Sequence, residues 1–168
     1  MPILDPLSFE CVSHSEEQTQ RLGARLAMFL PAVCVVALQG DLGAGKTHFA
    51  RGVGLGWRAA QELRSPTYTM LQEHHRDPDS GARLYHVDLY RAERDGDLDS
   101  IGLRELIEDN DGVVLIEWPE RAEGWIPGDA VRVRFDATAG SKRNLTFSTH
   151  SASAWQILLK FRKQAFGV

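Results

Sequence analysis

The sequence has few cysteines and no long apolar run. Only two of its 168 residues are cysteine, Cys11 and Cys34, whereas small secreted domains stabilised by disulfides use more. No apolar stretch approaches the roughly 18 residues that a membrane-spanning helix needs. The first ten residues also lack a basic segment followed by an apolar one, which a signal peptide would show. We therefore expect a cytoplasmic protein that does not contact a membrane.

An excess of basic residues is missing as well. The 19 Lys and Arg residues stand against 23 Asp and Glu residues, which gives a net charge of −4. Proteins that bind nucleic acid tightly by themselves usually present a basic surface to the phosphates. Direct binding of tRNA by the free chain is therefore disfavoured. Repeats, low-complexity segments and linkers are absent too, so residues 1–168 are expected to form one domain with its own core.

The order of the expected elements favours an α/β fold. Residues 33–38 and 113–116 are apolar without interruption, which is typical of strands buried on both faces of a parallel sheet. Further strands are expected over residues 67–73, 84–89, 131–135 and 145–147, and helices over 15–30, from 46 onwards, over 97–108 and over 155–166. The first two of these further strands can form a hairpin. The predicted architecture is a three-layer α/β fold of the P-loop NTPase class, with a largely parallel central sheet and antiparallel additions.

A glycine-rich segment follows the first apolar run. It matches the phosphate-loop pattern G-x-x-x-x-G-K-[ST] at every fixed position, and its residues are Gly40, Asp41, Leu42, Gly43, Ala44, Gly45, Lys46 and Thr47. Glycines let the backbone curl so that its N–H groups point at a phosphate, and the following helix adds its positive end. Lys46 is expected to contact the β- and γ-phosphates of a nucleoside triphosphate, and the Thr47 hydroxyl to ligate Mg²⁺.

Two carboxylates are candidates for a second ligand of that Mg²⁺. Asp88 and Glu117 each follow an apolar strand, at the sheet edge where phosphate-loop sites collect their acidic groups. The strand before Glu117 is uninterruptedly apolar and is therefore expected to lie beside the phosphate-loop strand. This favours Glu117 as the metal ligand and leaves Asp88 as its neighbour or as the residue that orients the attacking water.

The residues alone leave the type of nucleotide-binding protein open. A guanine-reading N/T-K-x-D motif is absent, which disfavours a GTPase. The arginines at 91–94 and Arg121 are scattered and expected on a solvated face rather than in the mobile lid of a kinase. A small-molecule or nucleotide kinase and a nucleotide-gated binding module nevertheless remain alternatives. His74, His75 and His86 lack a further ligand at metal-binding spacing, so we expect exposed loop histidines.

Four sequence blocks carry a family resemblance. They are GDLGAGKT at 40–47, SPTYT at 65–69, HVDLYR at 86–91 and LIEWPE at 115–120. In this order and spacing they closely resemble the TsaE (YjeE) family of small bacterial P-loop ATPases, and the likeness extends over roughly residues 13–147. The combination of four blocks is far more specific than the phosphate loop alone.

The resemblance implies an ATPase of tRNA threonylcarbamoyladenosine biosynthesis. Family members are thought to join the TsaB–TsaD pair and to reset it by hydrolysing ATP, so contact with tRNA is expected only through that complex. The family pattern implies Lys46, Asp88 and Thr67 as catalytic residues, with Thr67 in a switch-type loop that senses the γ-phosphate. It implies Thr47 and Glu117 as the ligands of Mg²⁺.

The resemblance also extends to the nucleoside. Ser15 and Arg143 lie where family members contact the base or the ribose. After Thr47 the family usually has a second Thr, whereas this chain has His48. The backbone N–H of His48 still serves the α-phosphate, but a hydroxyl contact would be lost.

Overall fold

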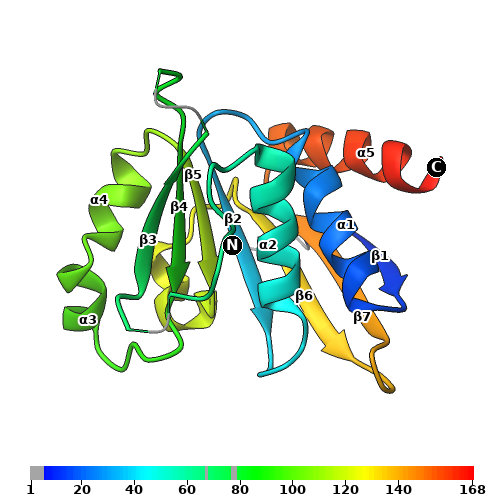
Figure 1. Cartoon of the computed structure of the whole chain (residues 1–168), viewed down its shortest axis with the longest axis horizontal. Coiled ribbons are helices and arrows are strands. Elements are labelled where there is room, and N and C mark those ends of the chain that lie inside the picture. Colours follow the sequence, from blue (N-terminus) through cyan, green and yellow to red (C-terminus); the bar gives the residue numbers. More distant parts are fainter. Residues whose placement is uncertain (1–5, 67, 77–78) are drawn as a thin grey trace, which may run out of the picture.

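The strands form one sheet. The computed structural model describes residues 6–66, 68–76 and 79–168, and within them seven strands are ordered β1-β7-β6-β2-β5-β4-β3 (Figure 1). The strands are β1 (Leu7–Ser13), β2 (Cys34–Gly40), β3 (Leu71–His75), β4 (Arg83–Asp88), β5 (Val113–Glu117), β6 (Val131–Ala137) and β7 (Arg143–Thr149). The helices are α1 (Glu16–Ala27), α2 (Lys46–Trp57), α3 (Asp95–Ser100), α4 (Leu103–Glu108), the 3₁₀ helix η1 (Pro119–Trp125) and α5 (Ala152–Phe166).

The centre of the sheet is parallel and its margins are antiparallel. β2 pairs in parallel with β5 and β6, and β4 pairs in parallel with β5. β3 joins β4 as a hairpin, and β7 and β1 extend the other side, all in antiparallel pairing. The predicted fold class and the predicted hairpin are confirmed.

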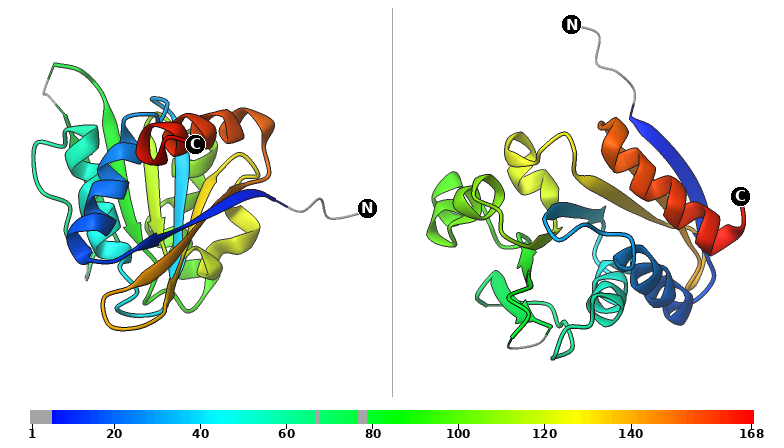
Figure 2. Two further views of the ribbon diagram at one scale, coloured as in Figure 1. Left: turned by 90° about the vertical axis from the view of Figure 1, so that its right-hand side faces the viewer. Right: turned by 90° about the horizontal axis from the view of Figure 1, so that it is seen from above.

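Both faces of the sheet are covered at its central strands, which explains the uninterrupted apolar runs of β2 and β5. In β2, Val36 and Leu38 pack into the cluster formed with α1, α2 and α5, whereas Val35 and Ala37 pack into the cluster formed with α3, α4 and η1. Side chains alternate between the two faces of a strand, so a strand covered on both sides is apolar at every position. Figure 2 shows the resulting three layers. In the described part of the chain, no helix combines the length and the apolar character that a membrane span requires.

Helices α1 and α2 pack closely against each other. A Cβ atom at Gly23 would lie 2.2 Å from the carbonyl oxygen of Phe49, and one at Gly52 would lie 1.9 Å from that of Gln20. Glycine at these two positions therefore lets the two backbones approach each other. This contact fixes the position of α2, whose first turn carries the phosphate loop.

Two expectations on secondary structure are wrong in detail, and one strand was missed. The strand expected from residue 67 begins only at Leu71, because Met70 has a left-handed backbone with φ of 58° that ends the preceding turn. The helix expected over 97–108 is divided into α3 and α4 at Gly102, whose φ of 68° lies outside the helical region. Strand β1 was not expected at all, because its pairing partner β7 lies more than a hundred residues away.

Candidate active site

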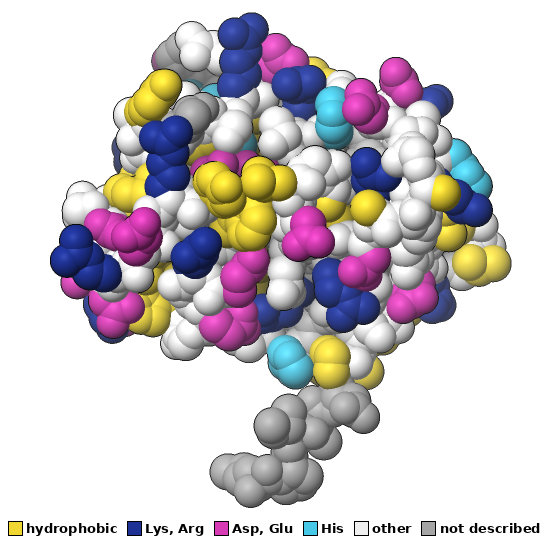
Figure 3. Space-filling view, turned by 90° about the horizontal axis from the view of Figure 1, so that it is seen from below, with side chains coloured by type: hydrophobic (Ala, Val, Ile, Leu, Met, Phe, Trp, Pro, Cys, Tyr) yellow, Lys and Arg dark blue, Asp and Glu magenta, His cyan; other side chains and the backbone are white. Residues whose placement is uncertain are grey.

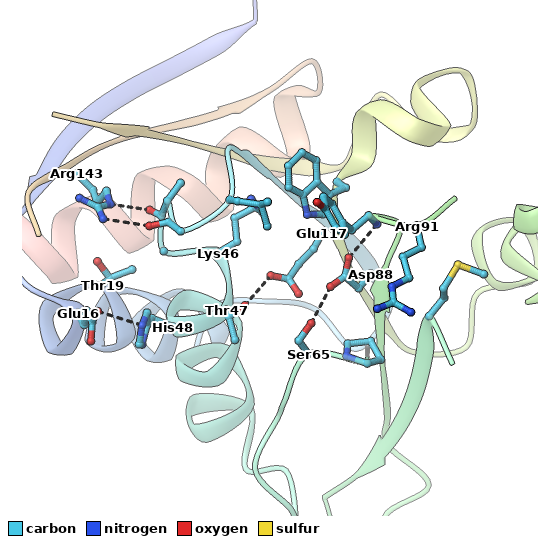
Figure 4. A pocket seen from close by; sticks show the side chains of 18 of the residues that line it. Glu16, Thr19, Lys46, Thr47, His48, Ser65, Asp88, Arg91, Glu117 and Arg143 are labelled. Carbon is cyan, nitrogen blue, oxygen red and sulfur yellow. Dashed lines mark hydrogen bonds and ion pairs between the residues drawn. The ribbon is translucent and has the colours of Figure 1, made fainter. Parts of the chain in front are cut away.

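A cavity of about 440 Å³ opens at the carboxyl ends of β2, β4 and β5. This volume suits a small-molecule ligand, and the carboxyl edge is where open α/β sheets bind their ligands. The lining residues come from the loop before α2, from the segment before β3, from the ends of β4 and β5, and from α1 and β7 (Figure 4). They are Glu16, Thr19, Leu42, Gly43, Ala44, Gly45, Lys46, Thr47, His48, Ser65, Pro66, Met70, Asp88, Tyr90, Arg91, Glu117, Trp118, Ser141 and Arg143.

The glycine-rich segment forms the expected turn between β2 and α2. Gly43 and Gly45 have φ values of 75° and 108°, a region that glycine enters without the steric cost of a Cβ atom. Gly45 is the N-cap of α2, and no side chain caps the amides of the first turn. These N–H groups, together with the helix dipole, offer a binding site for an anion.

Lys46 lies at the floor of this turn. Its ammonium group donates hydrogen bonds to the carbonyl oxygens of Gly40 and Asp41, and it lies 4.2 Å from the centre of the Trp118 ring. Burial lowers the pKa of Lys46, and the charge of Glu117 acts in the opposite direction. The loop's own carbonyl oxygens therefore hold a buried positive charge beside the free amides of α2.

Glu117 and Asp88 are neighbours in the sheet but have different partners. They are paired in the register of β5 and β4. Glu117 is only 2% exposed, and its Oε1 accepts a hydrogen bond from Thr47 Oγ1 at 3.4 Å. Asp88 accepts one from Ser65 Oγ at 2.8 Å and one from the backbone N–H of Tyr90 at 3.0 Å. The hydroxyl of Thr47 and the carboxylate of Glu117 thus bring together two oxygen ligands of the kind that Mg²⁺ prefers.

The expectation of exposed loop histidines is wrong for His74 and His86. Both lie in strands of the β3–β4 hairpin, and they are 7% and 0% exposed. His86 Nε2 lies 3.0 Å from Oε2 of Glu117. His75 is half exposed and forms an ion pair with Glu73. No group of three or more His, Cys, Asp and Glu side chains suited to a metal ion occurs in the described ranges.

The far end of the cavity is built by α1 and β7. The guanidinium group of Arg143 donates to the carbonyl oxygens of Gly43 and Ala44, both at 3.1 Å. His48 lies 3.5 Å from the carboxylate of Glu16. Ser15 is the N-cap of α1, as its spacing to Gln18 predicts, and its hydroxyl accepts a bond from Gln18 N–H. Ser15 itself does not line the cavity, and the first residue of α1 that does is Glu16.

The loop before β3 lines the opposite end. Thr67 lies outside the described residues, but its neighbours Ser65 and Pro66 line the cavity. Tyr68 is 86% exposed, and the guanidinium group of Arg91 lies 5.1 Å from the centre of its ring. Figure 3, which views this edge of the sheet, shows hydrophobic side chains gathered near the middle of the face between charged ones.

Several lining residues were not expected from the sequence. Arg91 was expected on a solvated face, and although it is exposed it also lines the cavity. Because Asp88 ends a strand and Arg91 follows it by three residues, the sequence could have indicated that Arg91 lies near the cavity. Glu16 and Thr19 had no such signal, because α1 reaches the cavity only through its packing on α2.

The comparisons with known proteins identify the family. The family described as "Threonylcarbamoyl adenosine biosynthesis protein TsaE" matches residues 13–145. The tRNA threonylcarbamoyladenosine biosynthesis protein TsaE of Treponema pallidum is 38% identical over 136 residues, which are 81% of this chain and 97% of the relative. The protein of the same name from Bacillus subtilis is 33% identical over 132 residues, which are 79% of this chain and 80% of the relative.

A solved structure shares the fold. The crystal structure of YdiB from Bacillus subtilis superposes with a TM-score of 0.75, covers 96% of this chain and 98% of its own, and has 24% sequence identity. At this identity the likeness supports the fold alone. The family match and the two relatives carry the assignment, and from them the chain belongs to the TsaE family, which is involved in tRNA threonylcarbamoyladenosine biosynthesis.

Proposed function

We propose that the protein is a Mg²⁺-dependent ATPase that acts with TsaD and TsaB homologues in the formation of threonylcarbamoyladenosine in tRNA. The observation that carries this proposal is the convergence of Lys46, Thr47 and Glu117 at the uncapped N-terminus of α2. Free amides and an ammonium group bind phosphates, while a hydroxyl beside a carboxylate suits the cation that accompanies a triphosphate.

In this proposal the amides from Gly43 to Thr47 surround the β-phosphate, and Lys46 moves from the loop carbonyl oxygens to the β- and γ-phosphates. Thr47 and Glu117 hold Mg²⁺, which, when bound, neutralises charge on the phosphate oxygens. The oxygen of water attacks the γ-phosphorus and the bond between that phosphorus and the bridging oxygen breaks. ADP leaves with the electron pair of that bond, the water oxygen becomes part of inorganic phosphate, and a proton of the water passes to the solvent.

Asp88 orients the attacking water. Its carboxylate is held from two sides, by the hydroxyl of Ser65 and by the N–H of Tyr90. A carboxylate fixed in this way can accept a hydrogen bond from water and direct the oxygen at the phosphorus. Thr67, beside Ser65 in the chain, is proposed to sense the γ-phosphate. Because Ser65 precedes this loop, its contact with Asp88 couples the loop to the catalytic acid.

The nucleoside lies at the end of the cavity built by α1 and β7. Arg143 is immobilised by the loop carbonyl oxygens, so its guanidinium group offers a fixed surface to the ribose or the base. Ser15 lies directly before the lining residue Glu16. The backbone N–H of His48 serves the α-phosphate. These residues are proposed to set the orientation of ATP.

The partner complex is proposed to accelerate hydrolysis. Tyr68 presents an exposed ring at the rim of the cavity, and Arg91 stacks on it. Within the described residues Arg91 makes no hydrogen bond or ion pair. A partner that orders this loop or supplies a charge can therefore change the rate. We propose that tRNA is contacted only through this complex and that the protein works in the cytoplasm.

The test is phosphate release from ATP by the chain alone and with its TsaB–TsaD pair. We expect slow release by the chain alone and marked stimulation by the pair, both lost in Lys46→Ala. The matched control is Lys142→Ala, because Lys142 lies on the turn between β6 and β7 and does not line the cavity. Binding of ATP without stimulation by the pair, or transfer of the phosphate to a metabolite, would contradict the proposal and favour a kinase.

A further inference from the structure

We infer that His86 is a positioning residue that orients the carboxylate of Glu117 toward Thr47 and the metal. The inference rests on the proposed function, because it assumes that Glu117 holds Mg²⁺. His86 touches neither nucleotide nor metal in this account, and it acts only through Glu117.

The pair is fully enclosed by the protein. His86 is 0% and Glu117 is 2% exposed, and Nε2 of the ring lies 3.0 Å from Oε2 of the carboxylate. The other oxygen, Oε1, accepts a hydrogen bond from the hydroxyl of Thr47 (Figure 4). Each oxygen of Glu117 therefore has one protein partner, and the two partners lie on different elements. Rotation of the carboxylate would break both bonds.

The strand register explains why the ring reaches this carboxylate. His86 pairs with Leu115 and Asp88 with Glu117 across the parallel strands β4 and β5. Alternate residues of a strand share a face, so His86 and Glu117 lie diagonally on the face that α2 covers. His86 lies within β4 and Glu117 is the last residue of β5, so strand pairing holds both residues more firmly than a loop would.

The His86 ring makes no other hydrogen bond within the described residues. Nδ1 of His86 is buried and has no hydrogen-bond partner there. A carboxylate only accepts hydrogen bonds, so Nε2 of His86 is the donor in the bond to Glu117. The bond to Glu117 is thus the interaction that accounts for a histidine at this position.

Partners of this kind matter for metal binding. A hydrogen bond to a ligating side chain fixes its orientation, and losing it typically lowers metal affinity about 10- to 100-fold. Without His86, one oxygen of Glu117 would be buried with no partner, and the carboxylate could turn away from Thr47. We expect weaker metal binding while the amides and Lys46 still bind the phosphates.

The experiment measures Mn²⁺ binding to the ADP complex by electron paramagnetic resonance, and ADP affinity in EDTA. His86→Leu removes the donor, whereas His86→Gln keeps an N–H donor at a similar reach. We expect the Mn²⁺ dissociation constant to rise about 10- to 100-fold in His86→Leu and to recover most of its wild-type value in His86→Gln. ADP affinity in EDTA should change less than about threefold in both.

The matched control is His74→Leu. His74 is also a buried histidine of the β3–β4 hairpin with an unpartnered Nε2, but it makes no bond to Glu117. It should lose similar stability and keep wild-type Mn²⁺ affinity. If His86→Leu does not fold, His86→Asn replaces it. The side chain of asparagine is one methylene shorter than that of glutamine, so its N–H donor does not reach Glu117.

The outcomes separate this inference from the proposed function. Wild-type Mn²⁺ affinity in His86→Leu or His86→Asn, or an equal loss in His74→Leu, would overturn the positioning role. A wild-type ADP complex that binds no Mn²⁺ would instead overturn the proposed Mg²⁺ site.

Discussion

The replacement Asp88→Asn tests whether this carboxylate acts in catalysis rather than in nucleotide binding. Asparagine keeps the shape of aspartate and one carbonyl oxygen, so the bond from the N–H of Tyr90 is retained. Its amide can donate to the Ser65 hydroxyl that now donates to Asp88 at 2.8 Å. The loop and the fold should therefore persist, while the negative charge that orients water is lost.

The magnitude follows from the proposed role of the charge. Positioned acid–base groups contribute about 10²- to 10⁴-fold to a rate, which equals about 3–5 kcal/mol of transition-state stabilisation at about 1.4 kcal/mol per factor of ten. Ser65→Ala keeps the charge but removes one hydrogen bond to it, which is worth about 1.5–3 kcal/mol. We expect kcat to fall by about 10²-fold or more in Asp88→Asn, and by a smaller factor in Ser65→Ala.

The assay is steady-state phosphate release in the presence of the partner pair, together with calorimetric titration of ADP. ADP affinity should remain within about threefold of wild type in both variants, since ADP lacks the phosphate that water attacks. A kcat within twofold of wild type in Asp88→Asn would refute the proposed role. An equal loss of ADP affinity and kcat would show instead that Asp88 supports the bound nucleotide.

Three further predictions concern the charge, the rim and the packing of the site. The lowered pKa of Lys46 means that ADP affinity, measured by titration, should fall as pH rises, beginning below the value of about 10.4 for an ordinary lysine; constant affinity up to that pH would contradict it. Arg91→Ala should lower kcat by roughly tenfold or more with ADP affinity unchanged, because its guanidinium group lines the cavity and can stabilise charge on the phosphate that the proposed reaction transfers. Gly23→Ala should lower the free energy of unfolding by about 1–3 kcal/mol in urea, because the new Cβ would lie 2.2 Å from Phe49 O, whereas Gly96→Ala, with nothing within 4 Å, should not destabilise.

The features that could be predicted from the sequence depend on residues that are close together in the chain. The glycine-rich turn, Lys46 and Thr47 occupy consecutive positions between a strand and a helix, so their local geometry depends on residues a few positions away. The apolar runs identified β2 and β5 as buried strands, and the second of them placed Glu117 at a strand end, as the shorter strand pattern before Asp88 did for that residue. Two spacings fit a capping box at the start of α1, Ser15 with Gln18 and Ser13 with Glu16, and the structure has Ser15 as the N-cap.

The remaining features depend on which distant residues the fold brings together. The order of the strands, with β5 directly beside β2, places Glu117 rather than Asp88 next to Thr47, as the sequence predicted. The register of β4 and β5 decides that His86 is buried against Glu117. Arg143 reaches the carbonyl oxygen of Gly43 across a separation of 100 residues.

The sequence by itself determined the fold class, the phosphate loop and the two candidate acids, because each depends on a local pattern of residues. The tertiary structure alone decided the hydrogen-bond partners of Asp88, the burial of His86 and the approach of Arg91 and α1 to the cavity. These contacts arise from strand register and helix packing, which join segments that no local pattern relates.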